Sequence, residues 1–143
     1  MVNALQNEKY GADKEDTGED FATSVKMISE RATTIVNELD TYTREGKEGE
    51  RLRYYNEDGQ IMKVLVYPAL SSDNVYEEYY YWNGALFFAY IWKDNESELY
   101  YYRDGMLIRW IDEDGTCHDN DWDDQEYVER GDKYWLKSIE QLQ

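Results

Sequence analysis

The sequence predicts an α+β domain: an N-terminal amphipathic helix packed on a six-stranded antiparallel β-meander of three hairpins, followed by a C-terminal helix. Apolar residues recur with helical spacing over residues 21–39. Three copies of an aromatic pair, a glycine turn and an apolar strand then follow between residues 51 and 112. At 143 residues the chain has the length of one domain. We predict a disordered acidic leader over residues 1–19 and a single domain over residues 20–142.

The N-terminal helix is predicted by one apolar stripe, whose members follow one another at steps of three or four residues: Phe21, Val25, Ile28, Ala32, Ile35 and Leu39. Lys26, Glu30, Arg31 and Asn37 fall mainly on the other faces of this helix. A helix of this length is marginal in water on its own, so the stripe is expected to cover one face of the sheet.

The three hairpins are predicted by turns that end in Asp58-Gly59, Asn83-Gly84 and Asp104-Gly105. Asn-Gly and Asp-Gly are strong hairpin signals because both central residues of a type I′ turn need positive φ. The six strands are expected at about 51–56, 60–67, 75–82, 85–92, 98–103 and 106–112.

Both faces of this sheet are expected to be covered. Along the fourth strand, Phe87 and Ile91 lie on one side and Phe88 and Trp92 on the other, so neither side is polar. The N-terminal helix accounts for one face. The other is left to the C-terminal segment, a partner or a ligand. A helix from about residue 124 is predicted to use Val128, Trp135, Ile139 and Leu142 as its apolar face.

Composition excludes several classes of function. The chain has 32 acidic and 15 basic residues, a formal charge of −17, which argues against binding nucleic acid phosphates. No apolar window is long enough to span a membrane, and the first 20 residues lack the pattern of a signal peptide. One cysteine and one histidine allow no internal disulfide and no cysteine- or histidine-rich metal site. Leu, Ile, Val and Phe are only 27 of 143 residues, but 15 Tyr and 5 Trp can supply an aromatic core.

The tyrosine runs and the tryptophans are the most unusual feature, and two interpretations stay open. The runs 79–81 and 100–102 are explained by cross-strand ladders that stabilise the sheet. They are also explained by an aromatic platform for a sugar, a peptide or a cationic group. The candidate ligand-binding residues of that platform are Trp82, Trp92, Trp110 and Tyr90.

Residues 112–132 carry ten acids and one base and contain the spacing Asp119-x-Asp121-x-Asp123. The EF-hand pattern fails, because Asp124 and Arg130 stand where Gly and Glu are needed. Calcium bound outside an EF-hand is one interpretation, and a solvated acidic loop is the other. The residues concerned are Asp112, Asp114, Asp119, Asp121 and Asp123. No other cofactor is expected.

The neighbours Cys117 and His118 are poorly placed for a catalytic dyad, because adjacent side chains on an extended chain point to opposite faces.

The hairpin segments, from the run beginning at Arg53 through the run Tyr79–Tyr90 to Glu98–Ile111, resemble a group of uncharacterised secreted lipoproteins of gut Firmicutes. The resemblance covers about residues 20–142 and includes His118-Asp119-Asn120 and the acidic, aromatic, helical end. It implies an extracellular domain held at the membrane by a lipid anchor in the full gene product. A chain complete as printed would instead be cytoplasmic. The turns are also similar to MORN-type and antitoxin-like hairpin repeats.

These observations predict a non-enzymatic protein. The expected role is a cell-surface domain that binds a protein, peptide or glycan through its aromatic sheet face or its acidic loop. The alternative is a cytoplasmic acidic inhibitor or immunity protein that mimics nucleic acid and blocks a basic partner. The first is expected to lose binding when an exposed tryptophan is removed. The second predicts a complex that weakens with salt.

Overall fold

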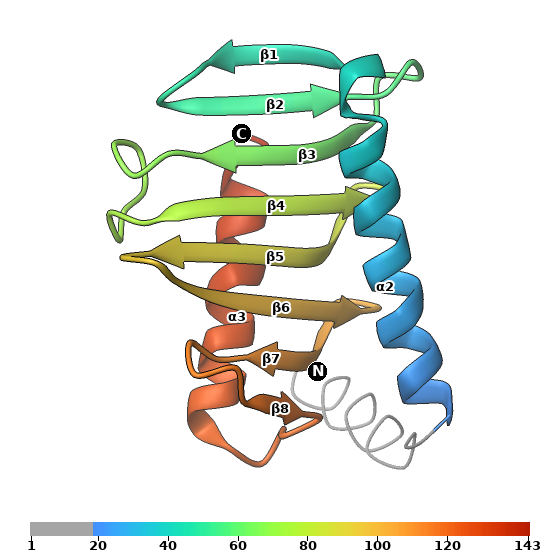
Figure 1. The fold of residues 1–143 in the computed structure, drawn as a ribbon, viewed down its shortest axis with the longest axis vertical. Helices are drawn as coiled ribbons and strands as arrows, with labels where there is room; N and C mark the ends of the chain where they lie inside the picture. Colours follow the sequence, from blue (N-terminus) through green and yellow to red (C-terminus); the bar gives the residue numbers. More distant parts are fainter. Residues whose placement is uncertain (1–18) are drawn as a thin grey trace.

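The computed structural model describes residues 19–143 of the chain. Figure 1 shows its elements, with a long helix at each end of the described range and eight strands between them. In order they are α2 (Glu19–Asn37), η1 (Leu39–Thr41), β1 (Thr43–Lys47), β2 (Arg51–Tyr55), β3 (Ile61–Val66), β4 (Tyr76–Trp82), β5 (Ala85–Lys93), β6 (Glu96–Arg103), β7 (Met106–Ile111), β8 (Cys117–Asp119) and α3 (Gln125–Glu140). The predicted leader, residues 1–19, lies outside the described residues apart from Glu19, where α2 begins.

The strands form one antiparallel sheet in which each pairs with its neighbour in sequence, from β1 to β8. The α+β class and the antiparallel meander are therefore confirmed, but the prediction of six strands is wrong. The two extra strands lie at the edges of the sheet. Every residue of β1 is exposed, and β8 is three residues long, so neither carries the apolar alternation that identifies a strand in a sequence. Tertiary pairing with β2 and β7 makes them strands.

The three predicted hairpins share a feature that the turns alone do not reveal. In each, the strand after the turn carries one extra residue, a β-bulge, three positions after the turn glycine. These bulge residues are Met62, Phe87 and Ile108, and all three are buried. Asn83-Gly84 and Asp104-Gly105 have positive φ at both positions, as predicted, whereas Asp58-Gly59 belongs to a longer loop with positive φ only at Gly59. The threefold repeat in the sequence therefore corresponds to a hairpin with a β-bulge that occurs three times in the structure.

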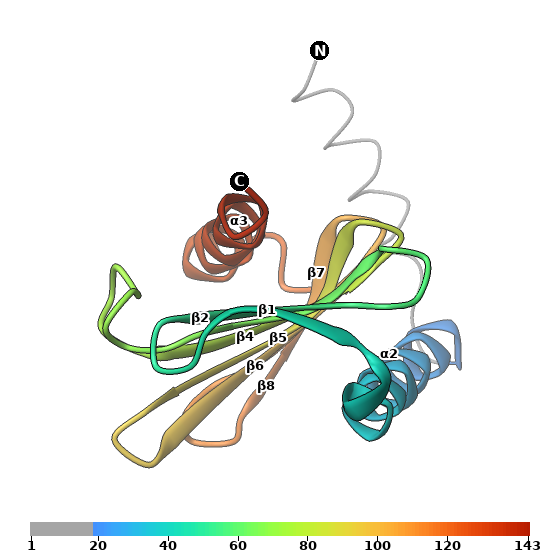
Figure 2. The same ribbon diagram turned by 90° about the horizontal axis from the view of Figure 1, so that it is seen from above.

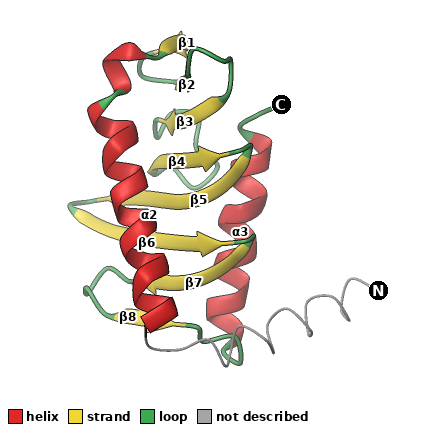
Figure 3. Cartoon of the chain, turned by 90° about the vertical axis from the view of Figure 1, so that its right-hand side faces the viewer, coloured by secondary structure: helices red, strands yellow, loops and turns green. Residues whose placement is uncertain are grey.

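The two long helices lie on opposite faces of the sheet (Figure 2). Both run across the strands, and Figure 3 shows the strands between them. The stripe on α2 is buried at Ile28, Ala32 and Ile35, so the helix that the spacing predicted does cover the sheet. α3 occupies the second face, which explains why the strands are apolar on both sides.

The apolar face predicted for α3 is only partly right: Val128 and Trp135 are half-buried and pack on the core, but the other two residues are not buried. Tyr127, Gly131, Tyr134, Lys137 and Ser138 are the buried residues of this helix. Ile139 and Leu142 are about 40% exposed. The residues that face the sheet are small or carry a polar group, because α3 packs on tyrosines that need hydrogen-bond partners. Small residues such as Gly131 and Ser138 let the hydroxyls reach the helix backbone, and a search for apolar spacing does not select such residues.

Tyrosine hydroxyls bind the backbone of α3 directly. Tyr81 donates to the carbonyl of Ser138 and Tyr102 to the carbonyl of Gly131, each at 2.7 Å. A Cβ atom added at Gly131 would lie 3.0 Å from Cβ of Leu107, so glycine permits the helix to approach β7 closely. The tyrosine ladders are therefore structural on this face of the sheet.

A charged cluster lies beside these tyrosines, with Lys137 and Glu77 buried and Asp73 and Lys133 at the surface. The ammonium of Lys137 lies 2.9 Å from Asp73 and 3.3 Å from Glu77, whose side chain is 2% exposed. Glu77 also accepts hydrogen bonds from the hydroxyls of Ser71 and Tyr79. Lys137 and, at 2.9 Å, Lys133 lower the pKa of Asp73. The cluster joins α3 to the β3–β4 loop and to β4.

Candidate functional site

Trp82 is the predicted ligand-binding residue with the most open surroundings. It is the last residue of β4, on the α2 side of the sheet, and 42% of its surface is exposed. The guanidinium carbon of Arg31, on α2, lies 4.3 Å from the centre of the indole ring and 5.7 Å from the ring of Phe87. This Arg31–Trp82 pair bridges the helix and the sheet, and a cavity opens on each side of it.

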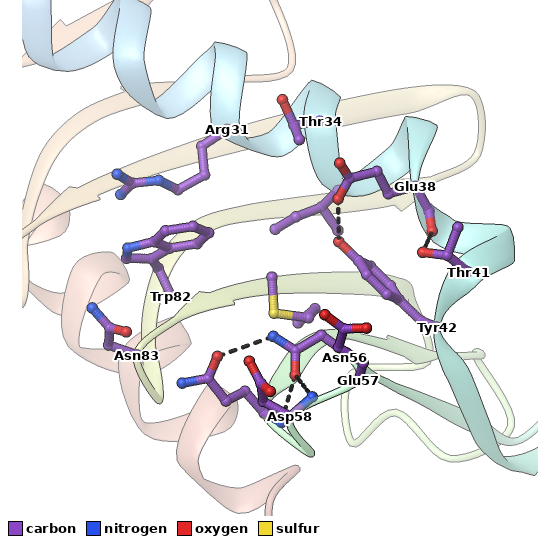
Figure 4. Close-up of a pocket in the computed structure, with 13 residues that line it drawn as sticks. Arg31, Thr34, Glu38, Thr41, Tyr42, Asn56, Glu57, Asp58, Trp82 and Asn83 are labelled. Carbon is purple, nitrogen blue, oxygen red and sulfur yellow. Dashed lines mark hydrogen bonds between the residues drawn. The ribbon is translucent and has the colours of Figure 1, made fainter.

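The first cavity has a volume of about 700 Å³ and lies between the end of α2 and the first two hairpin turns. Trp82 forms one wall, Tyr42 stands across from it, and the polar side chains of Glu38, Asn56 and Asp58 lie around them (Figure 4). Ile35 and the bulge residue Met62 contribute apolar lining. The rest of the lining is Arg31, Thr34, Thr41, Glu57, Gln60 and Asn83. Aromatic walls with an apolar floor and a polar rim are typical of a site for a small ligand.

Some polar side chains at the rim of the first cavity form hydrogen bonds within the fold, whereas others can bind a ligand. Asn56 accepts hydrogen bonds from the backbone N–H groups of Asp58 and Gln60, which holds the loop between β2 and β3. Tyr42 donates to Glu38 at 3.2 Å, and burial together with this bond raises the pKa of Tyr42. Within residues 19–143, the carboxylates of Glu57 and Asp58 and the amide of Asn83 make no side-chain hydrogen bond. They can exchange water for the hydroxyl groups of a ligand.

The second cavity, of about 710 Å³, continues the cleft along α2 toward the third hairpin turn. Its lining is more apolar, with Met27, Ile28, Leu86, Phe87 and Trp135. Its charged residues are Arg31, Arg103 and Asp104, so positive charges outnumber negative ones. In the first cavity Glu38, Glu57 and Asp58 outnumber Arg31. The cleft therefore changes the sign of its charge along its length.

Trp92 and Tyr90 share a face of the sheet with Trp82 but lie elsewhere on it. Trp92 pairs with Tyr76 at the opposite end of the β4–β5 hairpin and is 39% exposed. Tyr76 contacts both Tyr67 and Tyr90 edge to face, with ring centres 5.7 and 6.4 Å away. We call these four residues, Tyr67, Tyr76, Tyr90 and Trp92, the open aromatic surface. α2 crosses the strands nearer their other ends (Figure 1), so this surface has no helix over it.

A buried ion pair lies next to the open aromatic surface. The ammonium of Lys63 is 3.5 Å from Glu78, which also accepts hydrogen bonds from Tyr76 and Tyr80 at 2.6 and 2.7 Å. Burial lowers the pKa of Lys63, and the charge of Glu78 opposes that shift. The hydroxyls of Tyr76 and Tyr80 are thus turned toward a carboxylate of the fold.

Trp110 lies on the opposite face of the sheet, beneath α3, and only 5% of it is exposed. Its ring stacks on His118 with centres 4.3 Å apart, and the guanidinium of Arg130 lies 4.4 Å from its centre. Its indole N–H donates to Glu98 at 3.0 Å. Trp110 is therefore a core residue, separated by the sheet from the other three candidates.

The acidic segment uses several of its carboxylates within the fold. Asp112 accepts from His118 at 2.8 Å and from two backbone N–H groups of its turn, and its pKa is lowered chiefly by His118. Asp119 binds Arg109 through both oxygens, at 2.8 and 3.1 Å. Asp114, Asp121 and Asp123 are exposed. No three metal-ligating side chains of the described range gather in a way that could hold a metal ion. Cys117 and His118 pair with different residues of β7, Ile111 and Trp110, and so alternate in direction on β8.

Most of the cleft was not identified from the sequence. Arg31 was expected on the outer faces of α2, yet its side chain lies over Trp82. It lies between Ile28 and Ile35 in the helical repeat, at the border of the apolar stripe, which is the signal that could have marked it. Tyr42 and the loop around Asn56 come from segments that the sequence presents as connections. Their proximity depends on how α2 crosses the sheet.

Comparisons with known proteins add little to this description. No protein-family model and no curated protein matches the chain. Among solved structures, the chain is similar to a mutant of S. aureus TarM crystallised with fondaparinux, alpha-GlcNAc-glycerol and UDP. The TM-score is 0.44 at 11% identity, over 80% of this chain and 25% of that one. This similarity supports no inference about ligands. Within the described range, no helix has the length and apolar character needed to cross a bilayer.

Proposed function

We propose that this domain is a non-catalytic saccharide-binding module and that the cleft beneath α2 is its binding site. The single observation that carries the proposal is the position of Trp82. It stands between two cavities of about 700 and 710 Å³, and it is 42% exposed although most neighbouring strand residues are buried. Arg31 lies over part of the indole, and the exposed remainder of the ring offers a flat apolar surface to a ligand.

The composition of the cleft supports a sugar over other small ligands. A sugar ring has an apolar C–H face, which packs on an aromatic ring, and hydroxyl groups that both donate and accept hydrogen bonds. Trp82 and Tyr42 provide the rings. Glu57, Asp58 and Asn83 provide acceptors and amide donors at the rim. A purely apolar ligand would leave these groups without partners, at a cost in affinity.

The absence of catalysis is part of the proposal. A glycosidase needs one carboxyl group in apolar surroundings that keep it protonated, opposite a second carboxylate. Glu57 and Asp58 are exposed turn residues, and Glu38 is exposed and bonded to Tyr42. We expect no increase in reducing ends when the protein is incubated with an oligosaccharide that it binds. A rise in reducing ends that Glu38→Gln abolishes would make the domain a hydrolase.

Binding is tested by nuclear magnetic resonance with maltotriose, cellotriose and chitotriose as probes. The indole N–H signal of Trp82, assigned with Trp82→Phe, is expected to shift with at least one of them. Trp82→Ala is expected to abolish the ligand-induced shifts of the backbone amide signals around the cleft, while thermal unfolding shows a folded domain. Trp92→Ala, which changes a similarly exposed ring on the open aromatic surface, is the matched control and keeps binding. The opposite result would move the site to the open aromatic surface.

The extracellular, lipid-anchored location implied by the sequence resemblance belongs to the same proposal, because cell-wall glycans would then be within reach of the cleft. Fractionation of host cells that carry the complete native gene tests it. We expect the protein in the detergent-soluble membrane fraction with the mass of a lipidated form. Recovery from the cytosol would contradict the location and would direct attention to basic partners of the acidic segment.

A further inference from the structure

Arg31 is one of three arginines, with Arg44 and Arg51, for which residues 19–143 supply no ion-pair partner, and of these three it is the one that lines the cleft. Arg53, Arg109 and Arg130 each form an ion pair with an acidic side chain, at 3.7, 2.8 and 2.9 Å. Arg31 forms none with any residue of the described range. Its guanidinium lies over the rings of Trp82 and Phe87. A guanidinium that lies over a ring still has N–H groups that point away from the ring, and these can meet a ligand.

The charges around Arg31 indicate on which side of it an anion would bind. Arg31 and Trp82 are the border between the two cavities and line both of them. On the side of the second cavity, Arg103 adds a positive charge, Asp104 is the acidic residue of the lining, and the other side chains are mostly apolar. On the side of the first cavity there are three carboxylates. An anion is therefore favoured on the second side and repelled on the first.

We propose that the ligand is an acidic saccharide whose anionic group, a carboxylate or a phosphate, binds the guanidinium of Arg31 at the entrance of the second cavity. This inference rests on the proposed function. The planar fork of an arginine matches both groups through two parallel hydrogen bonds, and partial burial strengthens such charge-assisted bonds. The sugar ring lies against Trp82, and its remaining hydroxyls reach the polar rim of the first cavity.

The net charge of −17 limits the kind of acid that fits. A polyanion would meet the negative field of the whole protein, whereas one anionic group inside the cleft interacts mainly with the charges that line it. The ligand is therefore an uncharged sugar skeleton with a single acidic substituent per bound unit. It is not a densely charged polymer.

The test compares probes that share a skeleton and differ in charge. Methyl β-glucuronide is compared with methyl β-glucoside, and glucose 6-phosphate with glucose; each is titrated into the whole chain, with the indole signal of Trp82 as the readout. A charge-assisted hydrogen bond predicts about tenfold tighter binding for the charged probe that fits. The glucuronide and phosphate arms identify which acid the site takes.

Variants assign that preference to Arg31. Arg31→Gln is expected to bring the charged and neutral probes to equal affinity. Arg31→Lys, which keeps the charge but loses the planar fork, is expected to retain part of the preference. Arg44→Gln removes an exposed arginine of β1 that is outside the cleft, and it is the matched control. Thermal unfolding of each variant confirms that the domain is folded.

The outcomes separate this inference from the function on which it rests. Equal affinity for each charged probe and its neutral counterpart in the wild-type chain overturns the inference and leaves saccharide binding intact. A preference that survives Arg31→Gln also overturns it, because the anion then binds elsewhere. If none of the neutral or charged probes shifts the Trp82 signal, the proposed function and this inference fail together.

Discussion

The hydroxyl of Tyr102 donates a hydrogen bond of 2.7 Å to the carbonyl of Gly131, and Tyr81 makes the same bond to Ser138. Tyr81 and Tyr102 occupy the same position in successive hairpins, on strands β4 and β6. Two strand spacings are about 9–10 Å, and the seven residues from Gly131 to Ser138 span about 10.5 Å of helix. The distance between β4 and β6 thus matches the distance along α3 between the two carbonyls. This match determines how the helix lies across the strands.

Removal of these hydroxyls is expected to weaken the attachment of α3. Tyr102→Phe and Tyr81→Phe should each lower the free energy of unfolding by about 1 kcal/mol, since each leaves a buried carbonyl with one partner fewer. Tyr55 holds the corresponding position in the first hairpin, and its hydroxyl makes no hydrogen bond among residues 19–143. Tyr55→Phe is the matched control, with a change of less than about 0.5 kcal/mol in urea denaturation. Equal losses in all three variants would contradict the role of the two bonds.

The buried ion cluster gives a second prediction. Lys137→Met leaves the carboxylate of Glu77 buried without its cation, and we expect a loss of about 3 kcal/mol or more. Lys133→Met removes a partly exposed partner of Asp73 and should cost less than about 1 kcal/mol. Adding Glu77→Gln to Lys137→Met should restore part of the loss. Chemical denaturation measures all three, and equal costs for the two lysine variants would show that burial of Glu77 does not matter.

Stability should fall at alkaline pH because of the tyrosines. Burial raises the pKa of Tyr79, Tyr81, Tyr100, Tyr127 and Tyr134 above the usual 10.0. A group with a raised pKa in the folded state contributes its full stability below the unfolded pKa and loses it as pH rises. The loss therefore begins near pH 10, where unfolded tyrosines ionise. Tyrosinate absorbance and near-ultraviolet circular dichroism should change together in one transition. Gradual ionisation of these tyrosines in a folded domain would contradict this expectation.

The orientation of the helices is tested by two isoleucines. Ile35 on α2 is 1% exposed and Ile139 on α3 is 41% exposed. Ile35→Ala should lower the free energy of unfolding by about 2–5 kcal/mol, through lost burial and the cavity it leaves. Ile139→Ala should change it by less than about 0.5 kcal/mol. Both values come from thermal or urea unfolding. A large loss at Ile139 would restore the apolar face that the spacing of α3 predicted.

The candidate site was accessible from the sequence only in part. Trp82 could be selected because it extends a run of tyrosines on a strand that the adjoining Asn-Gly turn predicts. Trp110 was selected with it as another strand tryptophan but is buried beneath α3. Exposure at a strand end depends on where a helix crosses the sheet. The position of the crossing depends on contacts between residues far apart in sequence, so no local sequence pattern predicts it.

The sequence by itself determined the three hairpins and the amphipathic character of α2. Positive φ at Asn83-Gly84 and Asp104-Gly105 and the three- to four-residue spacing of α2 are local properties of the chain. Tertiary structure alone decided the edge strands β1 and β8, the inner face of α3 and the meeting of Arg31 with Trp82. These features require contacts between residues far apart in sequence. Their free energy comes from pairing and burial in the assembled fold.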